Sequence, residues 1–198
     1  FCAAIFTVLL PNMEAHETEE ELTFHAAFNG MAVISLNPTL RLGFAATLVI
    51  NVLCFPVFLV VAPYAVNGRF GDAMWAVCLA ASGLGACIGS VVTVLAVGHQ
   101  RLIGLAVISG LILSGAMVLL GTGISVWIVV LGAVLVGVVE ASWLTGWATS
   151  MQTLSPEHDL GKVVAIDTFV TSGTYPFIYL GSGLVAVSVG YSQTLIIV

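Results

Sequence analysis

The chain has 198 residues, of which 60% are hydrophobic and only 7% are charged, and its formal net charge is −6. Soluble domains carry about 25% charged residues, so this composition excludes an ordinary soluble protein and indicates an all-α, polytopic membrane helix bundle. Only four Lys and Arg residues are present, which excludes a basic surface for nucleic acid. The four cysteines lie in apolar stretches without CxxC spacing, so we expect no metal, cofactor or disulfide.

The N-terminal part divides into an apolar end and a polar connection. Residues 1–10 are apolar but too short to cross a bilayer, and Pro11 follows them, so we interpret them as the end of a membrane helix. Residues 11–40 begin with an acidic stretch, which we expect to be a solvated cytoplasmic loop. Within that loop, residues 22–36 place large apolar side chains on one helical face. This pattern favours a short interfacial helix that ends before Pro38.

Residues 41–198 form the expected transmembrane domain, because they contain five apolar runs long enough to cross a bilayer. A helix of about 20 residues spans the ~30 Å hydrocarbon layer. A sixth apolar run follows a turn at the end of the chain and is interpreted as a truncated sixth helix. The five complete spans are expected at residues 41–62, 74–97, 102–120, 125–151 and 163–187. The first partner of the protein is therefore the lipid bilayer.

Proline and glycine residues predict two local features within these spans. Pro56 removes one backbone donor from the first span, so we expect a kink at residues 52–56, and Pro63 is expected to end that span. In the second span, Gly85 and Gly89 form a GxxxG pattern. We interpret this pattern as a site of close helix packing.

The few basic residues predict the orientation in the membrane. The alternating spans place Arg41, Arg101 and Lys162 on one side, while Arg69 lies on the other side close to Asp72. Cytoplasmic loops carry the excess of Lys and Arg, so the side with three basic residues is assigned to the cytoplasm. We expect a multi-pass protein of the plasma membrane or bacterial inner membrane.

A single carboxylate, Glu140, lies near the middle of the fourth span. Trp143 and Trp147 follow it at spacings that place all three on one helical face. Ionisable residues at the membrane midplane usually face water, a partner or a substrate, so this face is a candidate wall for an amphipathic or cationic ligand. The alternative is a hydrogen-bonded glutamate at a helix interface, with the tryptophans as lipid anchors.

Asp167 lies about five residues beyond Lys162, near the start of the last complete span. It could pair with Lys162 or, across the cytoplasmic end, with Arg101, which would form a gate that breaks when the protein opens. The alternative is an acid in the first helical turn, favoured there by the helix dipole. The sequence leaves both interpretations open.

Three stretches resemble segments of a known transporter family, the major facilitator superfamily. They are similar to the approach to helix seven, the loop between helices ten and eleven, and the first half of helix eleven. The residues concerned are Phe28-Asn29-Gly30 with Asn37-Pro38-Thr39-Leu40-Arg41, then Gln152, Pro156, Glu157 and Gly161-Lys162 within residues 147–162, then Ile166-Asp167-Thr168 with Tyr175-Pro176. Within the superfamily, the chain looks like the enterobactin-exporter and macrolide-efflux branch, also called transmembrane secretion effectors.

The resemblance implies half of a twelve-helix fold. Residues 1–10 would end helix six, residues 11–40 would be the central loop, and residues 41–198 would be helices seven to twelve. The N-terminal half of the same transporter would then be a partner. In the family, helices seven and ten line the central cavity, which implies that Asn51 and Glu140 face one ligand. The alternative for Asn51, which also lies near the midplane, is a hydrogen bond between helices.

These observations lead to a functional hypothesis and an alternative. The hypothesis is a secondary transporter that exports a small amphipathic substrate, such as a drug or siderophore, by alternating access, coupled to protons through Glu140. The alternative is a membrane protein that does not transport, such as a sensor or an intramembrane enzyme. An enzyme would need a nucleophile with its base or a metal cluster within the spans. No His lies in any predicted span, so we expect no enzymatic activity.

Overall fold

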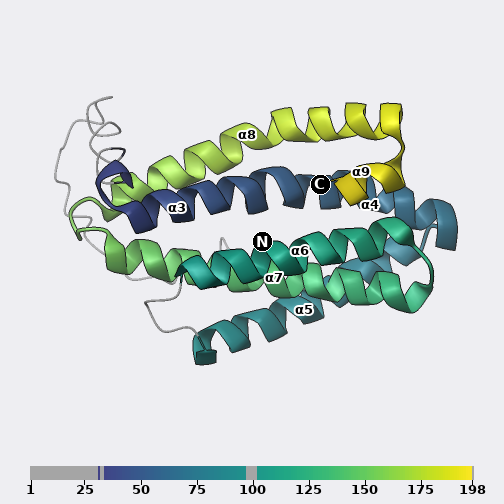
Figure 1. Cartoon of the computed structure of the whole chain (residues 1–198), viewed down its shortest axis with the longest axis horizontal. Coiled ribbons are helices and arrows are strands. Elements are labelled where there is room, and N and C mark those ends of the chain that lie inside the picture. The colour runs from purple at the N-terminus through teal and green to yellow at the C-terminus, as the bar shows by residue number, and fades with distance from the viewer. Residues whose placement is uncertain (1–30, 32–33, 97–101, 198) are drawn as a thin grey trace, which may run out of the picture.

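The computed structural model describes residues 31, 34–96 and 102–197, which form a bundle of helices aligned along the long direction of the molecule (Figure 1). No strand occurs in this part of the chain. The predicted all-α helix bundle is therefore confirmed. The predictions for residues 1–10, for most of residues 11–40 and for Arg101 lie outside the described residues.

The first span is one continuous helical rod made of three segments. It consists of α3 (Pro38–Thr47), the π-helical segment η1 (Leu48–Cys54) and α4 (Phe55–Phe70). The preceding short helix ends at Asn37, as the sequence predicts, and the Asn37 side chain accepts a hydrogen bond from the Thr39 N–H at 3.0 Å. Pro38 suits the first turn because its missing N–H would be unpaired there anyway. The span thus starts three residues earlier than predicted.

The two prolines of this rod behave differently from each other. Pro56 lies two residues after the end of η1, where the Phe55 N–H bonds to the Ile50 carbonyl five residues back. The wider π-turn relieves the clash between a proline ring and the carbonyl four residues earlier, while the predicted kink at residues 52–56 stays a prediction. Pro63, in contrast, lies inside α4 and does not end it. That prediction was wrong, because in a membrane a helix that loses one bond still satisfies its remaining backbone groups best as a helix.

The other helices begin and end within a few residues of the predicted bounds. α7 begins after Ser125, whose hydroxyl accepts a hydrogen bond from the Ile128 N–H at 3.4 Å. The largest difference is in the last span, where α8 starts before Lys162 and continues through Pro176. The helices are α5 (Met74–Ala96), α6 (Leu102–Thr122), α7 (Val126–Leu154), α8 (Leu160–Val189) and α9 (Tyr191–Ile197).

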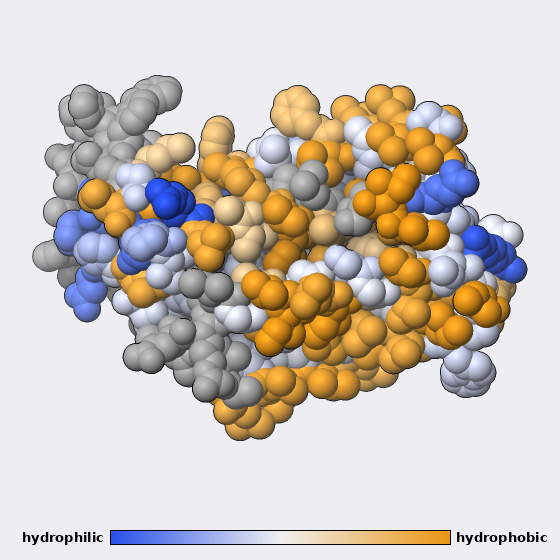
Figure 2. Space-filling model, viewed as in Figure 1, coloured by the Kyte–Doolittle hydropathy of each residue, from blue (hydrophilic) through white to orange (hydrophobic). Residues whose placement is uncertain are grey.

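The outer surface matches a membrane environment. Five helices of the described chain are long and apolar enough to cross a bilayer. Figure 2 shows hydrophobic residues over the middle of the molecule and strongly hydrophilic residues at its two ends. Because an exposed apolar band of this extent would be unstable in water, the protein is embedded in a membrane.

The tightest helix pair is α5 with α7, where glycines bring the two backbones into contact. A Cβ atom added at Gly85 would lie 2.1 Å from the Val134 carbonyl oxygen, and one at Gly137 would lie 1.9 Å from that of Ser82. The Ser142 hydroxyl on α7 donates to the Gly89 carbonyl on α5 at 3.1 Å. Small residues permit this approach, and the packing role predicted for Gly85 and Gly89 is confirmed.

Side chains tie three helices together at the end of the bundle where α4 finishes. The Arg69 guanidinium donates to the Gly121 carbonyl at the end of α6 (3.1 Å) and to the Ser192 hydroxyl in α9 (2.8 Å). The rings of Tyr64 and Tyr191 stack with centroids 5.1 Å apart. These contacts fix the short helix α9 against α4 and α6, and they hold the turn that ends α8.

Candidate functional site

Glu140 is the middle residue of α7, an apolar helix long enough to cross a membrane. α7 has 29 residues, with fourteen on either side of Glu140, so the carboxylate lies about 21 Å from each helix end. Its side chain is half-buried. The structure therefore places the only acid of α7 at the depth where a charged group is most costly in a membrane.

The two tryptophans share the face of Glu140, but they do not line an open cavity. Trp143 and Trp147 stack with ring centroids 6.2 Å apart and an angle of 6° between their planes. Both are almost completely buried, with exposures of 0% and 2%. In this conformation they form part of the core, so the exposed aromatic wall expected from the sequence is covered.

Trp147 is held by contacts from two neighbouring helices. Its six-membered ring fills the space above Gly43 on α3, where a Cβ atom would lie 2.1 Å from the ring. The Phe44 ring meets it edge-on, with centroids 5.8 Å apart. On the other side, the indole N–H donates to Asp167 Oδ1 on α8 at 3.0 Å. This hydrogen bond joins α7 to α8, two helices that otherwise make few contacts.

The acidic and basic residues at the start of α8 pair differently from the predicted gate. The Lys162 ammonium lies 3.2 Å from Asp159 Oδ1, and His158 Nε2 lies 2.9 Å from Asp159 Oδ2. Asp167 accepts its hydrogen bond from Trp147 instead. Lys162 lies one turn after Asp159, which favours that pair over Asp167. The pairing proposed with Arg101 lies outside the described residues.

Asn51 lies in η1, but its side chain is outside the described part of the structure, so the expected meeting with Glu140 stays a prediction. A residue that the sequence reasoning did not assign to the site is Tyr175 on α8. Tyr175 lies within electrostatic reach of both Glu140 and Asp167, and its ring stacks on Tyr179 with centroids 5.7 Å apart. The signal for it was present, because Tyr175 follows Asp167 at a spacing of two helical turns.

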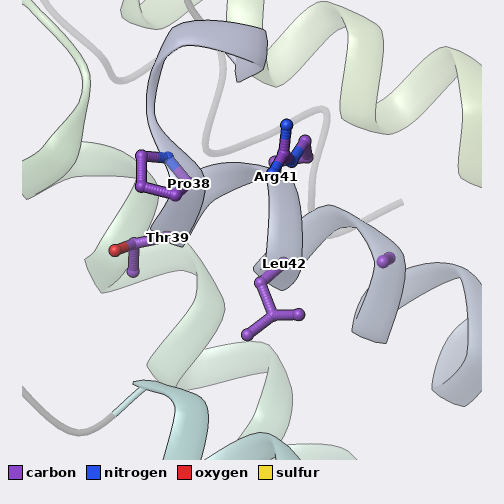
Figure 3. Close-up of a pocket in the computed structure, with 5 residues that line it drawn as sticks. Pro38, Thr39, Arg41 and Leu42 are labelled. Carbon is purple, nitrogen blue, oxygen red and sulfur yellow. The ribbon is translucent and has the colours of Figure 1, made fainter.

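Three hollows on the described surface are lined by residues other than Glu140. The largest, about 470 Å³, lies against the first turns of α3 and is lined by Pro38, Thr39, Arg41 and Leu42 (Figure 3), with Ala45 beyond them. The second, about 330 Å³, lies between α3 and α6, and the third, about 360 Å³, lies where η1 and α4 face α8 and α9. The last two are apolar, as expected for surfaces that face lipid tails.

Metal ligands are not gathered in this part of the bundle. Among residues 31, 34–96 and 102–197, no group of three or more His, Cys, Asp and Glu side chains is placed to hold a metal ion. The chemistry available around Glu140 is therefore that of a carboxylate, a phenol, indole rings and hydroxyl groups. These groups bind cations and exchange protons.

Comparison with known proteins finds no matching family model, no similar curated protein and no similar solved structure. The functional argument therefore depends on the geometry around Glu140.

Proposed function

We propose that the chain is the C-terminal half of a secondary active transporter of the major facilitator type, located in the plasma or inner membrane. It exports a small amphipathic cation by alternating access, and Glu140 couples export to protons. The observation that carries this proposal is the half-buried carboxylate at the centre of a 29-residue membrane-spanning helix. A carboxylate at that depth is costly unless it binds a cation or a proton, and exchanging one for the other is the step that antiport requires.

The surroundings of Glu140 support this role. The Tyr175 phenol acts electrostatically on it from α8, and Trp143 adjoins it on the same face of α7. A phenol beside a carboxylate suits an organic cation, since its ring offers a π-face. The proposed substrate site would be completed by the N-terminal half, so we expect this segment alone to be inactive.

The test is transport by the whole protein reconstituted in liposomes, with two radiolabelled probes. One is decanoylcholine, and the other is an alkyltrimethylammonium ion of the same chain length. Glu140→Gln keeps the size of the side chain but removes its titration. We expect this variant to lose accumulation driven by a proton gradient, at least tenfold, while exchange of probe down its own gradient continues.

The matched control is Glu157→Gln, which removes an exposed carboxylate from the connection between α7 and α8. It should transport like the unmodified protein. Full proton-driven accumulation by Glu140→Gln would show that Glu140 is not the coupling group. Absence of flux for both probes in the unmodified protein would contradict the proposed export of organic cations.

A further inference from the structure

Two polar atoms inside the described bundle have no hydrogen-bond partner, and they belong to helices that pack against each other. They are the indole N–H of Trp143 on α7 and the hydroxyl of Thr47 on α3. The two side chains are 0% and 2% exposed. An unpaired buried donor destabilises a protein, and most buried polar atoms find a partner. A third such atom, in Ser155, lies apart from these two at the end of α7.

The contact of Trp147 with α3 shows at which height along the bundle the Trp143 indole and the Thr47 hydroxyl lie. α3 and α7 run in opposite directions (Figure 1), and the Trp147 ring covers Gly43. The Trp143 ring stacks 6.2 Å from that of Trp147, which is about one helical turn. Thr47 lies one turn beyond Gly43 in the same direction. The two unpaired groups therefore lie at about the same level of the bundle, one on α3 and one on α7.

About one helical turn to either side of Trp143 and Thr47, the neighbouring residues are also polar. One turn towards the start of α3, Trp147 donates to Asp167. Nearly one turn in the other direction, Glu140 on α7 and Tyr175 on α8 lie close enough for electrostatic interaction. Since α8 runs parallel to α3 (Figure 1), Thr171 lies on α8 between Asp167 and Tyr175, at the level of Trp143. Trp143 and Thr47 therefore lie within about one helical turn of the level of Glu140. Glu140 is the carboxylate that binds the cation in the proposed function.

The chemistry of the two groups specifies what they can bind. An indole N–H can only donate a hydrogen bond, and a threonine hydroxyl can donate a second one to the same atom. Two donors at one level can bind one oxygen acceptor, such as a carbonyl. Glu140 lies about 5 Å further along α7, as three residues of helix rise require. The complete site would therefore fit an acceptor oxygen and a positive charge that are roughly 5 Å apart.

We infer that Trp143 and Thr47 form a two-donor subsite for an oxygen acceptor of the transported cation, while Glu140 binds the charged end. This inference rests on the proposed function. The subsite is covered in the conformation described here, and α8 lies over the neighbouring level through Tyr175. α8 is the least buried of the five apolar spans, with 6% of its most apolar stretch inside the bundle, so its displacement is the route of access that we propose.

The test uses substitutions that remove one donor and keep the shape. Trp143→Phe keeps an aromatic ring, and Thr47→Val is nearly isosteric. Binding of decanoylcholine, which carries an ester carbonyl close to its ammonium group, and of the alkyltrimethylammonium ion is measured on the whole protein in lipid nanodiscs. Each variant should bind decanoylcholine about tenfold more weakly, as the loss of one good hydrogen bond requires, with alkyltrimethylammonium binding unchanged.

Matched controls remove groups that already have partners or lie elsewhere. Thr93→Val removes a buried hydroxyl that donates to the Gly89 carbonyl in its own helix, and Trp75→Phe alters a tryptophan at the opposite end of the bundle. Both should bind the two probes as the unmodified protein does. The melting temperature without ligand gives a second readout. It should stay constant or rise in Thr47→Val, which keeps the volume of the side chain, because an unpaired buried group is lost.

Two results would overturn the subsite and leave transport of cations intact. Unchanged binding of both probes by the two variants would mean that the unpaired groups meet a trapped water or nothing. An equal loss for both probes, together with a lower melting temperature, would mean that the side chains only support packing. If the unmodified protein binds neither probe, the proposed function and the subsite fail together.

Discussion

The pair α5–α7 and the helix α8 represent two ways of holding a membrane helix in place. In the pair, glycines bring backbone against backbone, and the Ser142 hydroxyl adds a bond between the helices. α8 is exposed along most of its length and is attached by single side-chain interactions, among them the bond from Trp147 to Asp167. Lipid tails give no hydrophobic drive for helices to associate, so close contact and polar bonds determine which helices stay together.

The two arrangements differ in how much free energy it costs to displace a helix. Separating α5 from α7 would open a close-packed interface along several turns. In the described chain, α8 instead makes one side-chain bond to another membrane-spanning helix, from Trp147 to Asp167, and few of its residues are buried. The proposed transport by alternating access requires that some helices move while others keep their arrangement. We therefore assign α5 and α7 to the rigid part of the proposed transporter and α8 to its movable part.

The largest expected effect comes from inserting a methyl group into the rigid pair. In Gly137→Ala, the new Cβ would lie 1.9 Å from the Ser82 carbonyl oxygen, so the helices must separate. We expect a loss of about 2 kcal/mol in unfolding free energy, since overpacking costs about 1–3 kcal/mol and exceeds the gain in helix propensity. Thermal unfolding in lipid nanodiscs measures it.

The control for that substitution lies on α8. A Cβ atom at Gly181 meets nothing within 4 Å, so Gly181→Ala should leave stability unchanged or raise it slightly. Equal destabilisation by the two substitutions would contradict the distinction between a rigid pair and a loosely held helix.

A smaller effect is expected from the bond that holds α8 to α7. Trp147→Phe removes the donor and leaves Asp167 without that hydrogen bond, so α8 should move away from α7 more often. A side-chain hydrogen bond contributes about 0.5–1.5 kcal/mol net, enough to change the population of the displaced state by up to roughly tenfold. Spin labels at Thr149 and Ala165, both exposed, report the distance between the helices.

Asp167→Asn weakens the same hydrogen bond without removing it, and so should have an intermediate effect. The amide oxygen still accepts a hydrogen bond but carries no charge, so the shift should be smaller than in Trp147→Phe. Identical distance distributions in both variants and the unmodified protein would show that this bond does not restrain α8.

The smallest effect is expected where α9 meets α4 and α6. Arg69→Gln removes the bonds to the Gly121 carbonyl and the Ser192 hydroxyl, but the side chain is exposed, so the loss should be only about 0.5 kcal/mol. Hydrogen exchange should show faster opening of α9 and no change in α5 or α7. The control Arg41→Gln, at the other end of the first span, should leave α9 unchanged.

The sequence predicted the features that follow from hydrophobic periodicity and composition. The five spans, the packing role of Gly85 and Gly89, and the shared face of Glu140 and the tryptophans required only helical geometry. The continuation of α4 beyond Pro63 was missed, because a proline signal is weaker than the requirement for hydrogen-bonded backbone in a membrane.

The partners of individual side chains could not be predicted in the same way. That Asp167 accepts from Trp147, and that Trp143 and Thr47 are unpaired at one level, depends on how α3, α7 and α8 are positioned relative to each other. Such contacts lie far apart in sequence. The sequence left Lys162 open as a partner of Asp167, but in the structure Lys162 pairs with Asp159.

The π-helical segment η1 has a consequence for how this helix tolerates insertion and deletion. A π-turn closes its hydrogen bonds over five residues instead of four, so η1 accommodates an extra residue without lengthening the span. Deleting one residue within Leu48–Cys54 would convert the segment to ordinary α-helix and keep α3 and α4 each on its own face. α7 contains no π-helical segment. The same deletion inside α7 would therefore rotate every following side chain by about 100° around the helix axis.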